Sequence, residues 1–219
     1  MNNFFITGTG TEIGKTYVTC SIIEQLVESN KSVIGLKPII SGWEDYNDEM
    51  DTNRILSAMG RSFLPDDIEI ISPWRFAAPL SPDMAAAAEG VTIDFDSVVN
   101  FCNRAEALSD YLIIEGSGGV MVPINEENTF LDLMERLGMP VILVAGSYLG
   151  TISHTLTAIN SLESRNLNIH RIIINESECG IDLDKTKNTL ANFTDIKIDL
   201  LEKDGEVTGL LDSYDLETL

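Results

Sequence analysis

The sequence predicts an α/β fold, with a mostly parallel β-sheet that carries helices on both faces. Short runs of β-forming apolar residues alternate with stretches of helical periodicity along most of the chain. Several of these runs are apolar at every position, which is typical of parallel strands covered on both sides. A length of 219 residues without a linker or a repeat indicates one domain, residues 1–219.

Strands are expected where short apolar runs occur between turn residues. The first run, Asn3–Thr7, is followed by a glycine-rich loop. The later runs are 33–37, 68–72, 111–114, 141–145 and 171–174. Ligands of parallel α/β sheets gather at the carboxyl ends of the strands, so the residues after each run are the candidates for a site.

Helices are expected where apolar residues recur at helical spacing. The first runs from about Gly14 to Glu28, and the second starts with Asp51 as its N-cap. An alanine-rich helix begins at 84–89, and the others are 95–107, 129–137 and 151–164.

The composition excludes some partners. A formal net charge of −21 repels nucleic acid and anionic membranes, because the 14 Lys and Arg residues are scattered and form no basic stripe. No apolar run is long enough to span a membrane, and the N-terminus does not resemble a signal peptide. Cys20, Cys102 and Cys179 lack paired spacing and are expected to be reduced thiols, so a cytoplasmic location is predicted.

The segment GTGTEIGKT, residues 8–16, predicts a phosphate-binding loop between the first strand and the first helix. Glycines let backbone N–H groups converge on a phosphate, and the helix start adds its positive end. Lys15 can reach the β- and γ-phosphates of ATP, and the Thr16 hydroxyl suits Mg²⁺. The loop makes the fold P-loop NTPase-like, as a variant with Thr9 where the common pattern has glycine.

Charged residues follow two of the other strands. Lys37 could stabilise charge on a transferring phosphoryl group, or it could be a surface lysine that begins a loop. Glu115 follows four apolar residues and would be buried, so we expect it to meet a cation such as Mg²⁺. Asp51 is a second candidate Mg²⁺ ligand, although its N-cap role is nearly as good an explanation.

Three further segments are candidates with ordinary structural alternatives. The loop Gly116-Ser117-Gly118-Gly119 is either a tight turn or a second wall of the nucleotide site. Asn175 could offer its amide to adenine, or it could be a turn residue. Gly150-Thr151 opens a helix whose start could bind a carboxylate, or could be capped in the ordinary way.

Taken together, the chain resembles the dethiobiotin synthetase family from about Phe4 to Asn175. The resemblance lies in GTGTEIGKT (8–16), GLKPIISG (35–42), PLSPDMAAAAEG (79–90), IIEGSGGVMVPI (113–124), PVILVAGSYLGTISH (140–154) and IIIN (172–175). It implies an enzyme of biotin synthesis that joins the two amines of 7,8-diaminononanoate through CO₂ into a cyclic urea. The reaction uses ATP and Mg²⁺, with bicarbonate as the source of CO₂.

The resemblance also implies roles for individual positions. Lys37, Lys15 and Thr11 would be catalytic. The residues that hold the nucleotide would be Glu12, Ile13, Gly14, Lys15, Thr16, Tyr17, Asp51, Glu115, Gly116, Ser117, Gly118, Asn175 and Glu176. Those that serve Mg²⁺ would be Thr16, Asp51 and Glu115. Those that bind the diamine would be Thr11, Ser41, Gly150, Thr151, Ile152 and Ser153, the last four from the partner subunit of a homodimer.

The chain departs from the family pattern after its last predicted strand. Similar proteins carry a Gly-x-Ile-Pro element that helps to close the adenine site. Here residues 198–205 read IDLLEKDG, and no proline follows Pro140.

Other functions remain as alternatives at this point. A regulatory ATPase of the partition or septum-positioning type would carry a signature lysine at the position of Gly10, which this loop lacks. A corrin-type amidoligase would need a glutaminase domain, for which 219 residues leave no room. A nucleotide sensor without chemistry is the third alternative, and a buried Glu115 facing Lys15 and Lys37 is an argument against it.

Overall fold

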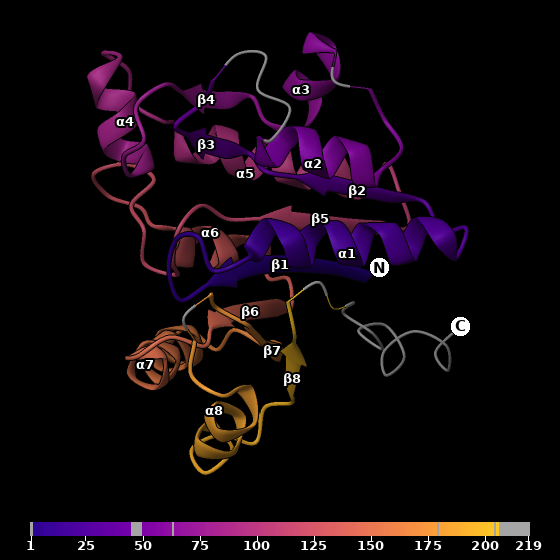
Figure 1. Cartoon of the computed structure of the whole chain (residues 1–219). Helices are drawn as coiled ribbons and strands as arrows, with labels where there is room; N and C mark the ends of the chain where they lie inside the picture. The colour runs from indigo at the N-terminus through magenta and orange to yellow at the C-terminus, as the bar shows by residue number, and fades with distance from the viewer. Residues whose placement is uncertain (1, 45–49, 63, 179, 204, 206–219) are drawn as a thin grey trace.

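The computed structural model describes residues 2–44, 50–62, 64–178, 180–203 and 205. Strands and helices alternate within them, as Figure 1 shows. The strands are β1 (Asn2–Gly8), β2 (Val33–Leu36), β3 (Ile39–Ser41), β4 (Trp74–Phe76), β5 (Tyr111–Glu115), β6 (Val141–Gly146), β7 (Ile169–Asn175) and β8 (Ile198–Leu201). The helices are α1 (Lys15–Glu28), α2 (Asp51–Ala58), α3 (Pro65–Ile71), α4 (Pro82–Ala88), α5 (Phe95–Glu106), α6 (Phe130–Leu137), α7 (Thr151–Ser164) and α8 (Leu183–Leu190).

Six of the strands form one sheet in the order β2-β5-β1-β6-β7-β8. All pairings in it are parallel, which confirms the predicted fold class. Strands β5 and β6 are buried along their whole length, in agreement with their unbroken apolar sequences. The chain leaves β1 toward β2 and leaves β6 toward β7, so the order reverses between β1 and β6. Such a reversal is where open α/β sheets bind ligands.

Helices cover both faces of this sheet. Figure 1 shows α1 and α2 in front of the β2-β5-β1 half and α5 and α6 behind it. Helices α7 and α8 pack on the half formed by β6, β7 and β8. The core between these layers is built from fully buried side chains such as Phe5, Ile23 and Leu143.

The register of the sheet brings two predicted site residues together. Leu36 of β2 pairs with Ile114 of β5, so the residues that follow them, Lys37 and Glu115, leave the sheet at the same edge. The phosphate-binding loop after β1 leaves at this edge as well, because β1 pairs in parallel with β5. The ends of β1, β2 and β5 therefore bring these residues to one edge of the sheet.

One predicted strand is wrong. Residues 68–72 fall on helix α3, whose start has Pro65 at its first turn and two acidic residues beside it. A short apolar run of this kind carries no period that distinguishes a strand from a helix. The strands next to it in the chain, β3 and β4, form a separate parallel pair.

Asp51 is the first residue of α2 rather than its N-cap, which is Met50, and no side-chain cap is present. The inner face of this helix includes Ile55 and Leu56, which are fully buried. Helix α8 and strand β8 were not predicted. Strand β8 extends the sheet by pairing with β7.

The structure describes two of the three cysteines that were predicted to be reduced thiols. Cys20 and Cys102 are free thiols, and burial raises the pKa of each to about 12, so they are unreactive near neutral pH. Cys179 and residues 45–49 lie outside the described residues. Within the described part of the chain, no helix is both long and apolar enough to cross a membrane.

Candidate active site

A cavity of about 850 Å³ lies at the carboxyl edge of the sheet. Such a volume suits a small-molecule site. The predicted site residues that line it are Thr11, Glu12, Gly14, Lys15, Thr16, Tyr17, Lys37, Ser41, Asp51, Glu115, Ser117 and Gly118. Segments that are far apart in the sequence thus meet around one space.

The phosphate-binding loop has the backbone that its glycines and its sequence position predict. Gly14 caps α1 in a left-handed conformation with φ of 93°, and Glu12 also has a positive φ of 57°. These turns direct the loop over the start of α1, where unpaired N–H groups favour an anion. Gly8 must remain small, because an added Cβ would lie 2.5 Å from Ile13 Cδ1 and 3.2 Å from the Val144 carbonyl oxygen.

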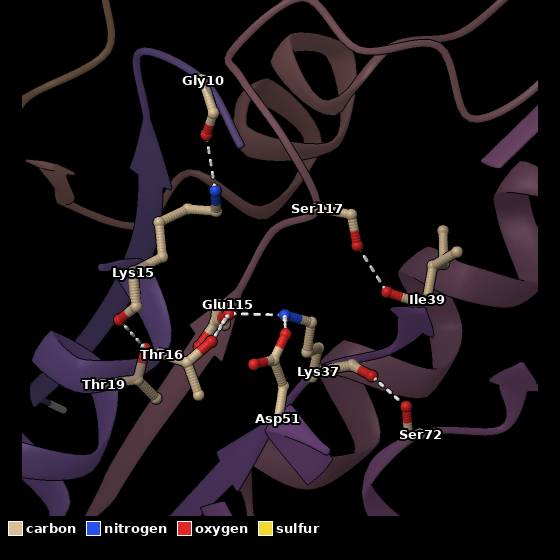
Figure 2. Close-up of polar contacts among 10 residues, drawn as sticks. All are labelled: Gly10, Lys15, Thr16, Thr19, Lys37, Ile39, Asp51, Ser72, Glu115 and Ser117. Carbon is tan, nitrogen blue, oxygen red and sulfur yellow. Dashed lines mark hydrogen bonds and ion pairs between the residues drawn. The ribbon is translucent and has the colours of Figure 1, made fainter. Parts of the chain in front are cut away.

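Lys15 folds back over this loop. Its Nζ donates to the Gly10 carbonyl oxygen at 2.7 Å (Figure 2). Burial, together with the neighbouring Lys37 ammonium, lowers the pKa of Lys15 to about 8, although Glu115 and Asp51 act in the opposite direction. A phosphate group placed here would favour the charged form of this lysine.

Lys37 lies between two carboxylates, as Figure 2 shows. Its Nζ forms an ion pair with Glu115 Oε1 at 2.6 Å and another with Asp51 Oδ2. The side chains of Lys37 and Glu115 are almost fully buried, whereas that of Asp51 is 37% exposed. Lys37 is therefore a site residue and not a surface lysine.

The charge state of this cluster follows from its contacts. Burial alone would lower the pKa of Lys37, but Glu115 and Asp51 outweigh it and raise that pKa above its ordinary value. Burial likewise opposes ionisation of Asp51, and Lys37 and Thr16 outweigh it, so the pKa of this carboxyl is lowered. The two carboxylates consequently favour the charged form of Lys37.

Neighbouring backbone groups fix the start of the Lys37 loop. The Lys37 N–H donates to the Ile71 carbonyl oxygen at 3.1 Å, and the Ser72 hydroxyl donates to the Lys37 carbonyl oxygen. The end of α3, which the sequence pattern misidentifies, thus serves to hold the backbone of Lys37 in place.

The residues predicted to serve Mg²⁺ fit such an ion. Thr16 Oγ1 donates to Glu115 Oε1 at 2.8 Å and also contacts Asp51. The other oxygen of the same carboxylate, Glu115 Oε2, is buried without a hydrogen-bond partner among the described residues. The described residues hold no cluster of three His, Cys, Asp or Glu side chains, and Mg²⁺ with its waters and phosphate oxygens does not need one.

The second glycine loop packs directly against the first. A Cβ on Gly119 would lie 3.4 Å from the Gly8 carbonyl oxygen and 3.6 Å from the Gly10 nitrogen. Ser117 Oγ donates to the Ile39 carbonyl oxygen at 2.6 Å, which ties this loop to β3 (Figure 2). The loop is therefore a wall of the same cavity, as one of the two sequence interpretations expected.

Some predicted site residues do not line the cavity. The Ile13 side chain is buried in the core, so only its backbone can serve a ligand. Asn175 donates from Nδ2 to the Ile13 carbonyl oxygen at 3.1 Å, beside the phosphate-binding loop. The others outside the cavity are Gly116, Gly150, Thr151, Ile152, Ser153 and Glu176.

The cavity includes residues that the sequence interpretation did not select. Arg54 lines it, one helical turn after Asp51 on α2. Its spacing of three positions from Asp51 was the signal that could have identified it. Leu80, Ser81 and Pro82 line it as well, from the segment that leads into α4 and from the first residue of that helix.

Comparison with known proteins identifies the family. A family model described as an AAA domain matches residues 2–207. The ATP-dependent dethiobiotin synthetase BioD of Caulobacter vibrioides (strain NA1000 / CB15N) is 44% identical over 196 residues, which cover 88% of each chain. The protein of that name from Acidiphilium cryptum (strain JF-5) is 43% identical over 87% of each chain.

Solved structures with a similar fold belong to other functions. The MinC:MinD cell division protein complex of Aquifex aeolicus matches with a TM-score of 0.57 at 15% identity, over 90% of this chain and 79% of that one. A ParA family ATPase from Chlorobium tepidum TLS matches with a TM-score of 0.55 at 14% identity, over 96% and 92% of the two chains. These likenesses concern the P-loop NTPase-like fold alone.

The sequence relatives span nearly the whole chain at an identity that fixes family membership. The chain belongs to the ATP-dependent dethiobiotin synthetase family and is an ATP-dependent ligase of biotin biosynthesis.

Proposed function

We propose that the cavity joins the two amines of 7,8-diaminononanoate through CO₂, at the expense of ATP, and that residues 1–219 act as one catalytic domain. One observation carries this assignment of roles: two lysines, a threonine and a buried glutamate meet beside a phosphate-binding loop, in a cavity with room for a second ligand. The functional groups present suit the transfer of a phosphoryl group to an oxygen nucleophile.

The nucleotide is held by the loop and the start of α1. Backbone N–H groups of residues 12–17 surround the phosphates, and Lys15 provides a mobile positive charge. Thr16, Glu115 and Asp51 would hold Mg²⁺, which neutralises phosphate oxygens when it is bound. Residues 116–118 form the facing wall, and Asn175 and Glu176 lie toward the base.

The diamine is placed against the γ-phosphate by Thr11 and Ser41, which line the same cavity from the first glycine loop and from β3. A neutral amine adds to CO₂ and loses a proton, which gives a carbamate. A carbamate oxygen attacks the γ-phosphorus and ADP leaves. The second amine then attacks the carbonyl carbon and expels phosphate, which closes the urea ring.

Lys37 has an electrostatic role in this sequence. Because its pKa is raised by Glu115 and Asp51, it stays protonated and cannot act as the base that deprotonates an amine. Its ammonium instead stabilises oxygens that gain negative charge during the transfer. Holding amine, carbamate and phosphate together contributes further, with effective molarities equivalent to about 7–11 kcal/mol.

We further propose a homodimer in the cytoplasm, in which each α7 start serves the site of the partner. Residues 150–153 lie at the positive end of α7 and outside the cavity of their own chain. A helix start favours a carboxylate, and the substrate has one at the end distant from its amines. Exposed apolar side chains near this helix, Leu149 above all, suit an interface.

The first test replaces Lys37 with alanine. Dethiobiotin formation from ATP, Mg²⁺, bicarbonate and the diamine, followed by product mass, should fall about 100-fold or more because the transition state loses its central cation. Lys31→Ala, at an exposed lysine outside the site, is the matched control. Near-normal turnover by a folded Lys37→Ala protein would contradict the role. Phosphate release without the product in the unaltered protein would favour a nucleotide switch.

The second test concerns Lys15, whose pKa is lowered to about 8 by burial and by Lys37. Phosphate should raise this pKa, so ATP binding at pH 8.5 should take up protons, and affinity should fall as pH rises through 8. Calorimetry in buffers of different ionisation enthalpy measures the uptake. In Lys15→Arg the guanidinium stays charged, and the uptake should disappear. Equal uptake by both proteins would show that another group binds the proton.

The third test asks whether sites are shared between subunits. Lys37→Ala should be inactive, and Ser153→Asp should be nearly inactive because its carboxylate repels that of the substrate. Mixing them should restore about a quarter of normal activity, since half of the randomly formed dimers are mixed and each has one intact site. A mixture no more active than its components, with subunit exchange verified by mass, would exclude the shared site.

A further inference from the structure

Arg54 brings a third cation to the cavity, beside Lys15 and Lys37. It lies on α2, one helical turn after Asp51, and lines the same space. Side chains of a helix lean toward its N-terminus, so this guanidinium is directed back toward the edge of the sheet where Lys37 and Glu115 meet. The steps proposed for the two lysines do not involve it.

The surroundings of Cys20 locate the guanidinium between α1 and α2. These two helices are in contact and lie side by side (Figure 1). Burial has the largest effect on the pKa of the Cys20 thiol and raises it, Glu115 and Asp51 raise it further, and Arg54 acts in the opposite direction. A single thiol on α1 therefore senses both the guanidinium and the carboxylates that Figure 2 shows around Lys37.

Arg54 differs from the two lysines in what it contacts. Lys15 Nζ donates to the Gly10 carbonyl oxygen, and Lys37 Nζ is paired with two carboxylates. Within the described part of the chain, the Arg54 side chain makes no hydrogen bond or ion pair, and the residue is exposed. A guanidinium does not lose its proton in proteins, so it can turn toward an anion in the cavity as a full positive charge.

The charges around the cavity leave a need for such a cation. Among the described residues that line it, acids and bases are equal in number: Glu12, Asp51, Glu115, Lys15, Lys37 and Arg54. Two of the acids are already paired with Lys37. One Mg²⁺ offsets only part of the charge of a triphosphate, and the oxygens of the transferring group carry much of the rest. The planar fork of an arginine matches those oxygens in geometry as well as in charge.

We propose that Arg54 is a further catalytic residue, whose guanidinium donates to oxygens of the γ-phosphoryl group of ATP before and during its transfer. This inference rests on the proposed function, because it requires ATP to occupy the cavity. The position beside Asp51 puts Arg54 on the Mg²⁺ side of the loop, where the terminal phosphoryl group reacts. Arg54 then contributes to the binding of ATP and not to that of ADP.

The test compares two nucleotides that differ in the γ-phosphoryl group. Calorimetry on the full chain, with Mg²⁺, measures the binding of ADP and of the ATP analogue with an imido bridge between its β- and γ-phosphorus. In Arg54→Ala the analogue should bind about tenfold more weakly, because a charge-assisted contact is lost, while ADP should bind as before. Unaltered ADP binding also shows that the variant is folded. The kcat for dethiobiotin formation should fall at least about tenfold.

Two further variants serve as controls. Arg54→Lys keeps the charge without the fork and should recover part of both losses. Arg61→Ala removes an exposed arginine that follows α2 outside the cavity, and it should change neither affinity nor kcat.

Three results would overturn the inference alone. They are normal binding of the analogue by Arg54→Ala, equal weakening of the analogue and of ADP, and a rise in the KM for the diamine with analogue binding unchanged. Failure of the unaltered protein to bind the analogue would instead overturn the proposed function.

Discussion

The ion pairs of Lys37 with Glu115 and Asp51 are the constraint on which the rest of the site depends. A buried ammonium is costly unless carboxylates meet it, and a buried carboxylate is costly without a cation. The parallel register of β2 and β5 satisfies both needs, because it delivers Lys37 and Glu115 to the same edge. Asp51, at the start of α2, completes the pairing and keeps the lysine charged.

This arrangement divides two tasks between two lysines. Lys37 is held by two carboxylates, which raise its pKa and favour its charged form. Lys15 contacts only a carbonyl oxygen, and its pKa near 8 allows it to respond to the phosphates. The acidic chain thereby binds an anion through local groups, although its net charge of −21 opposes the approach of ATP. The same edge also provides the buried oxygen of Glu115 that suits Mg²⁺.

Local patterns predicted the parts of the fold that are long, apolar or bounded by glycine. The first strand, its loop and α1 are examples, and so are Lys37 and Glu115 as neighbours at strand ends. The strand predicted at residues 68–72 was wrong, because so short an apolar run does not define a period that distinguishes a strand from a helix. The Asn175–Ile13 contact and the Tyr17–Gly205 contact could not be predicted, because each depends on how distant segments pack.

In the proposed reaction, this edge of the sheet transfers a phosphoryl group to a carbamate oxygen. Bicarbonate labelled with ¹⁸O tests it directly, in a short reaction with ATP, Mg²⁺ and the diamine. One label should appear in the released phosphate and one in the carbonyl of the dethiobiotin product. Labelled product accompanied by unlabelled phosphate would contradict the account, since ATP would then be hydrolysed by water and the carbamate would never be phosphorylated.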